Sequence, residues 1–242
     1  TDDNDNSGIL RYVRLEYTGY AFDDQHESNG ISLYGVGAGT QISYVQTYVG
    51  SDDGIEFFGG SVNVDHCVVV DCTDDSFDWT EGWNGTAHHL VAYQSDVTCD
   101  CLMECDNNGD NASATPVSHP KLSHVTLIGN GSSENSRGIR LRAGTQVTLD
   151  NAIITGKPYT VNVETAQTDA YLASNKSTAL TNITMTGDFR NENASAAYTA
   201  DDFATATGNS ANAASVEVTD RYYTPGKGAF EASSDWTEGW TR

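Results

Sequence analysis

Two short segments of the chain carry carboxylates in the same pattern. In Asp52–Phe57 and in Asp74–Trp79, an Asp pair is followed three positions later by a third acidic residue that stands between apolar ones. Such hard oxygen ligands, with no histidine or thiolate cluster beside them, favour Ca²⁺ over softer metals. We therefore expect a Ca²⁺ site here, with a third oxygen-rich loop at 104–110 contributing. The candidate ligands are Asp52, Asp53, Glu56, Asp74, Asp75, Asp78, Glu104, Asp106 and Asp110.

Each of these acidic groups also has a simpler interpretation. Aspartates commonly accept hydrogen bonds from backbone N–H groups in turns and then need no ion. A further segment, Asp3–Gly8, begins like an EF-hand loop, but Arg14 stands where the twelfth residue of such a loop is Glu. We expect this segment to be a disordered acidic terminus.

Catalysis by the same residues is the alternative to a structural cation site. A polysaccharide lyase needs a base beside a cation or an arginine that neutralises the sugar carboxylate. The catalytic candidates are Glu56, Asp78, Arg140 and Arg142, because the two arginines are expected to project outward from the same ladder as Glu56 and Asp78. Arginines beside acidic residues also serve as charge balance, and a glycosidase-like carboxylate pair arises trivially in so acidic a chain.

The elements that position these residues follow from an internal repeat. The two acidic segments begin 22 positions apart, and Asn29–Leu33 and Arg137–Leu141 fit the same frame. Short β-branched and aromatic runs bounded by Gly, Asn, Asp and Ser recur without helical periodicity. Such a period predicts an all-β fold, a single-stranded right-handed parallel β-helix. A second strand in each coil is expected at 40–45, 61–64 and 145–149.

Alternation along the strands assigns their faces. Ile55 and Phe57 point inward, as do Phe77 and Trp79, so that the acidic residue between each pair points outward. Rungs of a parallel β-helix lie about 4.8 Å apart, which places the carboxylates of one rung over those of the next. Two such charges repel by roughly 1 kcal/mol in water and by about 3.5 kcal/mol at an effective dielectric constant near 20. A bound cation or a shared proton would relieve the repulsion.

The chain is expected to form one domain. Its parts are an N-terminal rung with the acidic terminus (1–28), regular rungs (29–96), a long loop insertion (97–136), further rungs (137–187) and an irregular C-terminal cap (188–242). Within the cap, a short helix is expected near Asp201–Phe203.

Aromatic residues and histidines give weaker signals. The hexapeptide Asp78–Trp83 recurs as Asp235–Trp240, and we interpret both copies as a turn that follows a Trp-bearing strand and covers the core. Outward aromatic side chains could present an apolar face to a sugar ring or to another subunit. The expected outward residues are Tyr34, Tyr48, Phe58 and Trp83. The histidines are scattered, and no catalytic set of histidine, serine and carboxylate is evident.

Composition excludes two classes of partner. Lys and Arg number 12 against 34 Asp and Glu, a formal net charge of -22, which excludes nucleic-acid binding. The sequence contains no run of about 18 apolar residues, so that we expect no membrane span. The five cysteines favour an oxidising compartment, as disulfides or buried thiols rather than as zinc ligands. They are Cys67, Cys72, Cys99, Cys101 and Cys105.

The two acidic segments and the closing Ser233–Trp240 resemble those of secreted or surface β-helix proteins from marine and Bacteroidetes-type bacteria, within the pectate-lyase-like superfamily. The resemblance implies a fold and export to the cell surface or medium, but no particular reaction. We expect an acidic, Ca²⁺-stabilised module that binds a polysaccharide or cell-surface glycan or builds extracellular assemblies. The alternatives are a Ca²⁺-dependent lyase or glycoside hydrolase, and a filament subunit that associates end to end.

Overall fold

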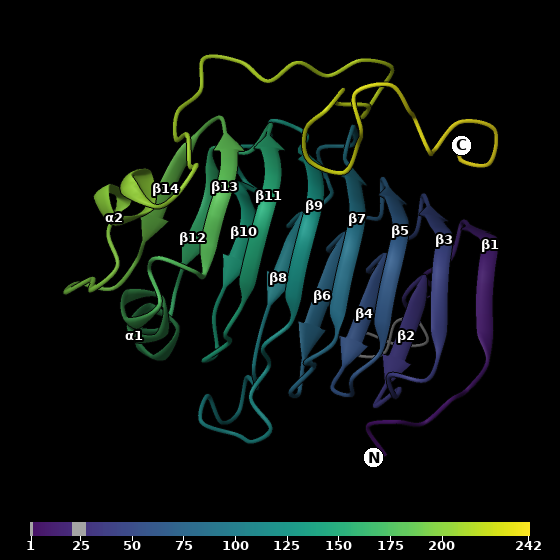
Figure 1. Cartoon of the computed structure of the whole chain (residues 1–242), viewed down its shortest axis with the longest axis horizontal. Helices are drawn as coiled ribbons and strands as arrows, with labels where there is room; N and C mark the ends of the chain where they lie inside the picture. The colour runs from purple at the N-terminus through teal and green to yellow at the C-terminus, as the bar shows by residue number, and fades with distance from the viewer. Residues whose placement is uncertain (1, 21–27) are drawn as a thin grey trace.

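The computed structural model describes residues 2–20 and 28–242, and part of the expected N-terminal segment, with His26, lies outside the described residues. Two seven-stranded parallel sheets wind along one axis (Figure 1). The first sheet contains β1 (Ile9–Glu16), β3 (Gln41–Tyr48), β5 (Asn63–Val70), β7 (Thr86–Tyr93), β9 (Lys121–Ile128), β11 (Thr148–Thr155) and β13 (Leu180–Met185). The second contains β2 (Ile31–Tyr34), β4 (Ile55–Phe58), β6 (Phe77–Thr80), β8 (Met103–Cys105), β10 (Arg137–Leu141), β12 (Tyr159–Val163) and β14 (Asp188–Asn191).

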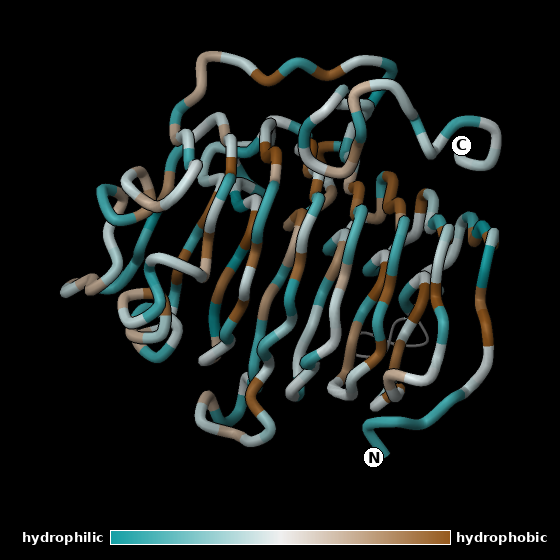
Figure 2. Tube along the Cα trace, viewed as in Figure 1, coloured by the Kyte–Doolittle hydropathy of each residue, from teal (hydrophilic) through white to brown (hydrophobic). Residues whose placement is uncertain are grey.

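The expected parallel β-helix is confirmed, and so is the register of its rungs. On the second sheet Ile55 pairs with Phe77 and Phe57 with Trp79, and all four are buried. Glu56 pairs with Asp78 between them on the outer face. Hydrophobic residues recur along the strands, whereas the residues of the N-terminal arm are hydrophilic (Figure 2). The stacking of one rung's inward residues on the next therefore builds a core that runs the length of the coil.

Each long strand of the first sheet bends at one residue with left-handed backbone geometry. In β3 this residue is Tyr44, with a φ of 55°, and its neighbours Ser43 and Val45 remain paired with β5. The equivalent residues in the other strands all have positive φ angles. They are Tyr12, His66, His89, His124, Asn151 and Asn182. Residues other than glycine rarely adopt this backbone geometry, although Asn and His do so several times more often than the average residue. The bend therefore recurs at one level of every coil.

A glycine column lies just before the short strands of the second sheet. A Cβ atom at Gly30 would collide with the carbonyl oxygen of Gly54, and one at Gly54 would collide with Val69 and with the carbonyl oxygen of Ser76. Close approach between successive coils thus explains why Gly recurs here in the repeat.

The stretch 97–136 was expected to leave the stack as a loop and to return near Leu122–Thr126. Strand β9 confirms the return, but the extent of the loop was wrong, because the stretch also contains β8. Both strands pair in register with the strands before and after them. The irregular part is the shorter segment 106–120 between these strands. Its many Asp, Asn, Gly and Ser residues concealed a three-residue strand whose inward side chains are Met103 and Cys105.

Two helices interrupt the β pattern. Helix α2 (Ala200–Thr205) begins with a capping box between Thr199 and Asp202, close to the predicted position. Helix α1 (Ala166–Ser174), between β12 and β13, was not predicted, because it carries only a weak apolar stripe. It is held by Asp169, whose carboxylate accepts hydrogen bonds from Asn191 and from the backbone of Ala197 and Tyr198. None of the described helices is long and apolar enough to span a membrane.

The C-terminal segment only partly behaves as the expected cap. Residues 207–213 bond to β13 at the end of the stack, but residues 216–242, here called the C-terminal strap, run back over the first sheet toward β1 (Figure 1). Tyr222 and Phe230 cover outward valines of β5 and β7. At the far end, the backbone N–H of Arg242 donates to Gln46 Oε1 at 2.8 Å. The strap thus buries an apolar stripe on the outer face of the first sheet.

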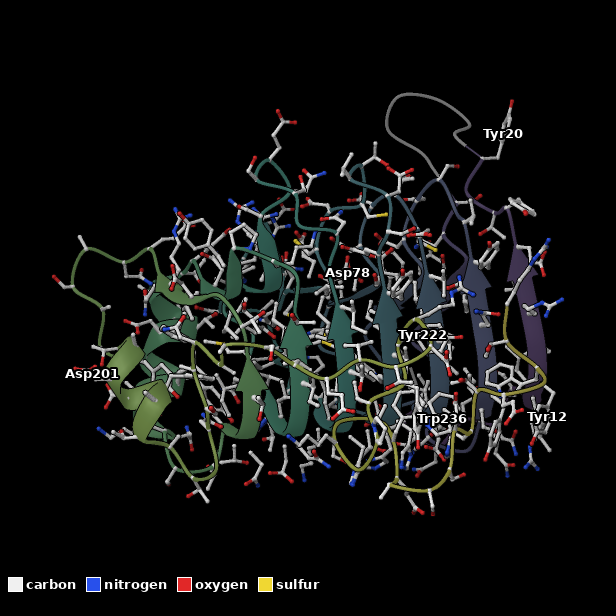
Figure 3. All side chains as sticks on the ribbon, turned by 90° about the horizontal axis from the view of Figure 1, so that it is seen from above. Tyr12, Tyr20, Asp78, Asp201, Tyr222 and Trp236 are labelled. Carbon is white, nitrogen blue, oxygen red and sulfur yellow. The ribbon has the colours of Figure 1, made fainter. Side chains whose placement is uncertain are left out.

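The repeated hexapeptide adopts two different structures, contrary to our interpretation. Trp79 lies on β6, and Trp83 is only 1% exposed, stacked on Phe57 with ring centroids 3.8 Å apart. The expectation that Trp83 points outward was therefore wrong. In the second copy, Trp236 and Trp240 lie on the strap and meet the ring of Tyr44 edge-on, outside the coil. Figure 3 shows Trp236 over the same half of the stack as Tyr12.

The two copies provide a matched test of the core. We expect Trp83→Ala to lower the free energy of unfolding by about 3 to 5 kcal/mol, because it opens a cavity among packed rings. Trp240→Ala should cost less, since that ring is half-buried and can be replaced by water. Denaturant unfolding of both variants measures the difference. Equal losses would contradict the assignment of the two tryptophans to core and strap.

Candidate functional site

The outer face of the second sheet carries a column of charged side chains. Glu56, Asp78, Glu104 and Arg140 occupy one position on successive strands β4, β6, β8 and β10. The Asp pairs at 52–53 and 74–75 lie in the turns that lead into β4 and β6. We call Asp52, Asp53, Glu56, Asp74, Asp75, Asp78 and Glu104 the acidic ladder. The structure thus brings together seven of the nine predicted metal ligands.

Carboxylate oxygens of the ladder approach one another in overlapping groups. Within each group, one oxygen per residue lies within 4.8 Å of the others. The groups are Asp52, Asp53 and Asp74; then Asp53, Glu56 and Asp78; then Asp75, Asp78 and Glu104. Asp53 belongs to the first and second groups, and Asp78 belongs to the second and third. The three groups therefore form a continuous strip of oxygen ligands across three rungs.

The turn-forming role of the aspartates is also present. Asp53 Oδ1 accepts a hydrogen bond from the backbone N–H of Asp75 at 2.9 Å, and Asp75 Oδ1 accepts one from Cys101 at 2.7 Å. These bonds fix each carboxylate relative to the next rung. Each uses one carboxylate oxygen for turn geometry, which leaves the second oxygen of the group for other contacts.

Burial makes this accumulation of charge costly. Burial, and then the neighbouring Asp74 carboxylate, raise the pKa of Asp53 well above its usual value. Burial and the Asp53 carboxylate do the same to the pKa of Asp75 and of Asp78. The pKa of Glu56 is raised mainly by burial, although the hydrogen bonds that its carboxylate accepts from Asn29 and from Asp78 counter the shift. The ladder therefore holds a proton or a cation more readily than isolated carboxylates do.

One oxygen of the ladder stands out. Asp78 Oδ1 is buried and has no hydrogen-bond partner among the described residues. A buried carboxylate oxygen without a donor carries a large desolvation cost. No lysine or arginine in the described part of the chain forms an ion pair with Asp53, Glu56, Asp75 or Asp78. A hard dication bound by oxygens fits this position, since it would supply the missing partner.

The two candidate arginines are already engaged. Arg140 Nη1 lies 2.6 Å from Glu104 Oε1, and its Nε lies 2.7 Å from Glu164 Oε1. Arg142 contacts Glu104 and, at 2.7 Å, Asp106. Each guanidinium therefore sits between two carboxylates, the geometry of charge balance. The ladder divides into an arginine-neutralised part at β8 to β10 and a purely acidic part at β4 to β6.

The other predicted ligands separate from the acidic part. Asp106 is committed to Arg142, and Asp110 lies exposed in the segment between β8 and β9. Asp3–Gly8, expected to be disordered, lies along the turn at 37–40: the carbonyl of Asp3 accepts the N–H of Ala38, and that of Asp5 accepts the N–H of Gly39. All five cysteines are buried and unpaired, so that the buried-thiol alternative describes them and no disulfide forms.

Aromatic side chains border the acidic part of the ladder. Tyr34 and Phe58, two positions beyond Ser32 and Glu56 on β2 and β4, stack with ring centroids 4.3 Å apart. Tyr34 is 70% exposed. Together with Glu81 and Asn84 the two rings line an open depression of about 400 Å³. The arrangement offers an apolar ring face beside hydrogen-bonding groups.

Sequence reasoning missed a second column, on the first sheet. The left-handed bend residues place their rings in one stack, in which neighbouring centroids lie between 4.3 and 5.1 Å apart. The stack contains Tyr12, Tyr44, His66, His89 and His124. The signal was present, because Tyr44, His66 and His89 recur at intervals matching the repeat and each precedes a buried apolar residue.

No curated protein and no solved structure matches the chain. A family model described as a pectate-lyase-like β-helix domain matches residues 1–241. This match covers the acidic ladder, the ring stack and the strap together. The chain therefore belongs to the family of pectate-lyase-like β-helix domains.

Proposed function

We propose that the protein is a secreted or cell-surface β-helix module that is stabilised by Ca²⁺ at the acidic ladder and binds glycans beside it. The observation that carries the proposal is the environment of Asp78. Its Oδ1 is buried without a hydrogen-bond partner among the described residues, and Asp78 contributes a carboxylate oxygen to two of the groups in which ligand oxygens lie within 4.8 Å of one another. A Ca²⁺ ion there would be bound by Asp53, Glu56 and Asp78, with Asp75 and Glu104 close by.

Calcium suits this site better than other ions. Ca²⁺ accepts six to eight oxygen ligands in a tolerant geometry, whereas Mg²⁺ requires a strict octahedron. The ladder oxygens form a strip across three rungs whose spacing is fixed by strand register, and not a compact octahedral cage. This arrangement suits Ca²⁺ better than Mg²⁺. A sulfur atom, that of Cys101, lies within 4.8 Å of carboxylate oxygens of Asp75 and Asp100, and burial raises the pKa of this thiol well above its usual value. A thiolate-seeking metal is therefore disfavoured.

The neighbouring aromatic depression supports glycan binding. Sugar rings present C–H faces that pack on exposed aromatic rings, and their hydroxyl groups bond to carboxylates and amides such as Glu81 and Asn84. The formal net charge of -22 repels anionic glycans unless a cation intervenes. A Ca²⁺ ion at the ladder would cancel this repulsion by binding sugar carboxylates. We propose an acidic polysaccharide as ligand, bridged by Ca²⁺ at the ladder and packed on Tyr34.

An enzyme built on the same ladder is the second candidate. The raised pKa of Glu56 and of Asp78 favours the protonated carboxyl group that a general acid requires. The engagement of Arg140 and Arg142 by carboxylates weighs against a lyase that uses either arginine to neutralise the sugar carboxylate. End-to-end assembly stays a prediction, and residues 207–213 cover one end of the stack.

Calcium should stabilise the protein measurably. At a Ca²⁺ concentration about 100 times its Kd, the free energy of unfolding should rise by about 2.7 kcal/mol over that in EDTA. Asp78→Asn should abolish most of this gain, because it removes the shared carboxylate. Asp201→Asn, an exposed acid on α2 at the far end of the molecule (Figure 3), should leave it unchanged. Thermal unfolding with and without Ca²⁺ measures all three proteins, and a Tm that does not respond to Ca²⁺ counts against the ion.

Without metal, the ladder should make stability rise as the solution is acidified. Carboxyls whose pKa is raised by folding contribute stability that is fully present below their ordinary pKa, near 4, and is lost as pH rises through the higher folded value. In EDTA we therefore expect Tm to increase when the pH is lowered from about 7 to about 5. Glu56→Gln together with Asp78→Asn should flatten this dependence. A Tm that instead falls over the same interval would show that the ladder is not strained.

Glycan binding can be tested with polygalacturonate and alginate, each with Ca²⁺ or with EDTA. Tyr34→Ala should weaken binding by roughly threefold to tenfold, as about 0.5 to 1.5 kcal/mol of ring contact implies. Tyr17→Ala, which removes another exposed tyrosine directly after β1, serves as the control. Ultraviolet absorbance of the same mixtures reports unsaturated products. Binding without product supports the module, product formation supports the enzyme, and neither across the panel removes both glycan proposals.

A further inference from the structure

The ring stack on the first sheet has a carboxylate at its centre. Asp65 lies on β5 next to His66, and its Oδ1 is 2.9 Å from Nδ1 of His89 on the next strand. Its Oδ2 is 2.9 Å from Nδ1 of His66. The two imidazole rings stack 4.3 Å apart with their planes 19° from parallel. One carboxylate therefore bridges two histidines from adjacent rungs.

This cluster differs in chemistry from the acidic ladder. One potential ligand atom from each of Asp65, His66 and His89 lies within 4.8 Å of the others. His66 Nδ1 is buried and, despite its distance to Asp65, has no well-directed hydrogen-bond partner among the described residues. Burial opposes ionisation of Asp65, yet the two imidazoles hold the pKa of its carboxyl far below the usual range. The group thus combines an ionised oxygen ligand with two nitrogen ligands.

We propose that Asp65, His66 and His89 form a second metal site, which takes a borderline transition-metal dication such as Zn²⁺. Imidazole nitrogen with one carboxylate oxygen is a ligand set of Zn²⁺ and its neighbours, whereas Ca²⁺ prefers oxygen alone. Three protein ligands leave further coordination positions for water or another ligand. A metal ion would replace the hydrogen bond between His89 Nδ1 and the Asp65 carboxylate and would supply His66 Nδ1 with a partner.

The surroundings allow an ion to enter and the ligands to adjust. The side chain of Asp65 is 46% exposed and that of His89 is 30% exposed. Asp65 also lines an open groove of about 340 Å³ with His88 and Asn63. Near-parallel rings cannot direct both lone pairs at one ion, so that binding requires the more exposed His89 ring to tilt. The ion would then tie β5 to β7 beneath the C-terminal strap, whose Trp236 meets His66 edge-on at 4.7 Å.

Residues at the equivalent position in other strands suggest conservative substitutions for the test. Asn151 and Asn182 occupy the bend position in β11 and β13 with the same positive φ as His66 and His89. His66→Asn and His89→Asn therefore keep the backbone geometry while they remove the imidazole ligand. Asp65→Asn keeps the shape and loses the charge. His88→Ala is the matched control, because His88 lies on the same strand but bonds to Ser123 instead.

Zinc titration by calorimetry should be carried out with Ca²⁺ in excess, so that the ladder does not take up Zn²⁺, and with a reducing agent present. The wild-type chain should bind one equivalent of Zn²⁺. Asp65→Asn, His66→Asn and His89→Asn should each weaken binding on the order of 10- to 100-fold or more, whereas His88→Ala should not. Circular dichroism of each variant verifies folding. Quenching of Trp236 fluorescence by Cu²⁺, lost in Trp236→Phe, gives an independent readout of binding at this place.

Two results would overturn the proposal. One is the absence of Zn²⁺ binding up to a concentration of about 100 μM, a weak affinity for a three-ligand site. The other is binding that survives all three ligand substitutions, which would place the ion elsewhere. Neither result bears on Ca²⁺ at the acidic ladder, because the two columns lie on different sheets and use different ligand atoms.

Discussion

The vertical register between successive coils is the constraint on which the rest of the structure depends. Every strand pairs with the strand one coil away, so that each side chain has a fixed neighbour above and below. For apolar residues this alignment yields a continuous core, because Ile55 lies on Phe77 and Phe57 on Trp79. A shift of one residue would turn all these side chains to the outside. The hydrophobic stack therefore fixes the position of every outward side chain without any contribution from the outward side chains themselves.

The same alignment concentrates chemistry on the surface. Register imposed by the core places Glu56 over Asp78 and His66 beside His89, whatever their mutual preference. The two columns differ in how the stacking is satisfied. Stacked imidazoles attract through their rings and share the carboxylate of Asp65. Stacked carboxylates repel. Arg140 and Arg142 both pair with Glu104 at one end of the ladder, whereas Asp53, Glu56 and Asp78 form no ion pair with a described lysine or arginine, so that this part of the ladder favours a proton or an ion.

The sequence predicted those features that depend on period and alternation. The parallel coil, the inward residues at 55, 57, 77 and 79, and the overlap of the two acidic segments follow from a 22-residue interval and from strand geometry. The strap could not be predicted, because its contacts with β5 and β7 join residues far apart in the chain and do not follow from the internal repeat. The short strand β8 was hidden because polar residues on both sides imitate a loop. The histidine stack escaped notice because the bend residue varies among Tyr, His and Asn, which share a backbone conformation and no side-chain chemistry.

The strap alters what the outer surface of the coil can do. Val68, Val70 and Val91 point away from the core, and without Tyr222 and Phe230 over them they would form an apolar stripe on the first sheet. An exposed stripe of this kind favours association, which the strap prevents by covering it with residues from the same chain. The acidic ladder on the second sheet has no such cover from the strap. The strap therefore closes part of one sheet and leaves the ladder and the Tyr34–Phe58 ring pair of the other sheet uncovered, and the same register that crowds the charges of that face holds them in place.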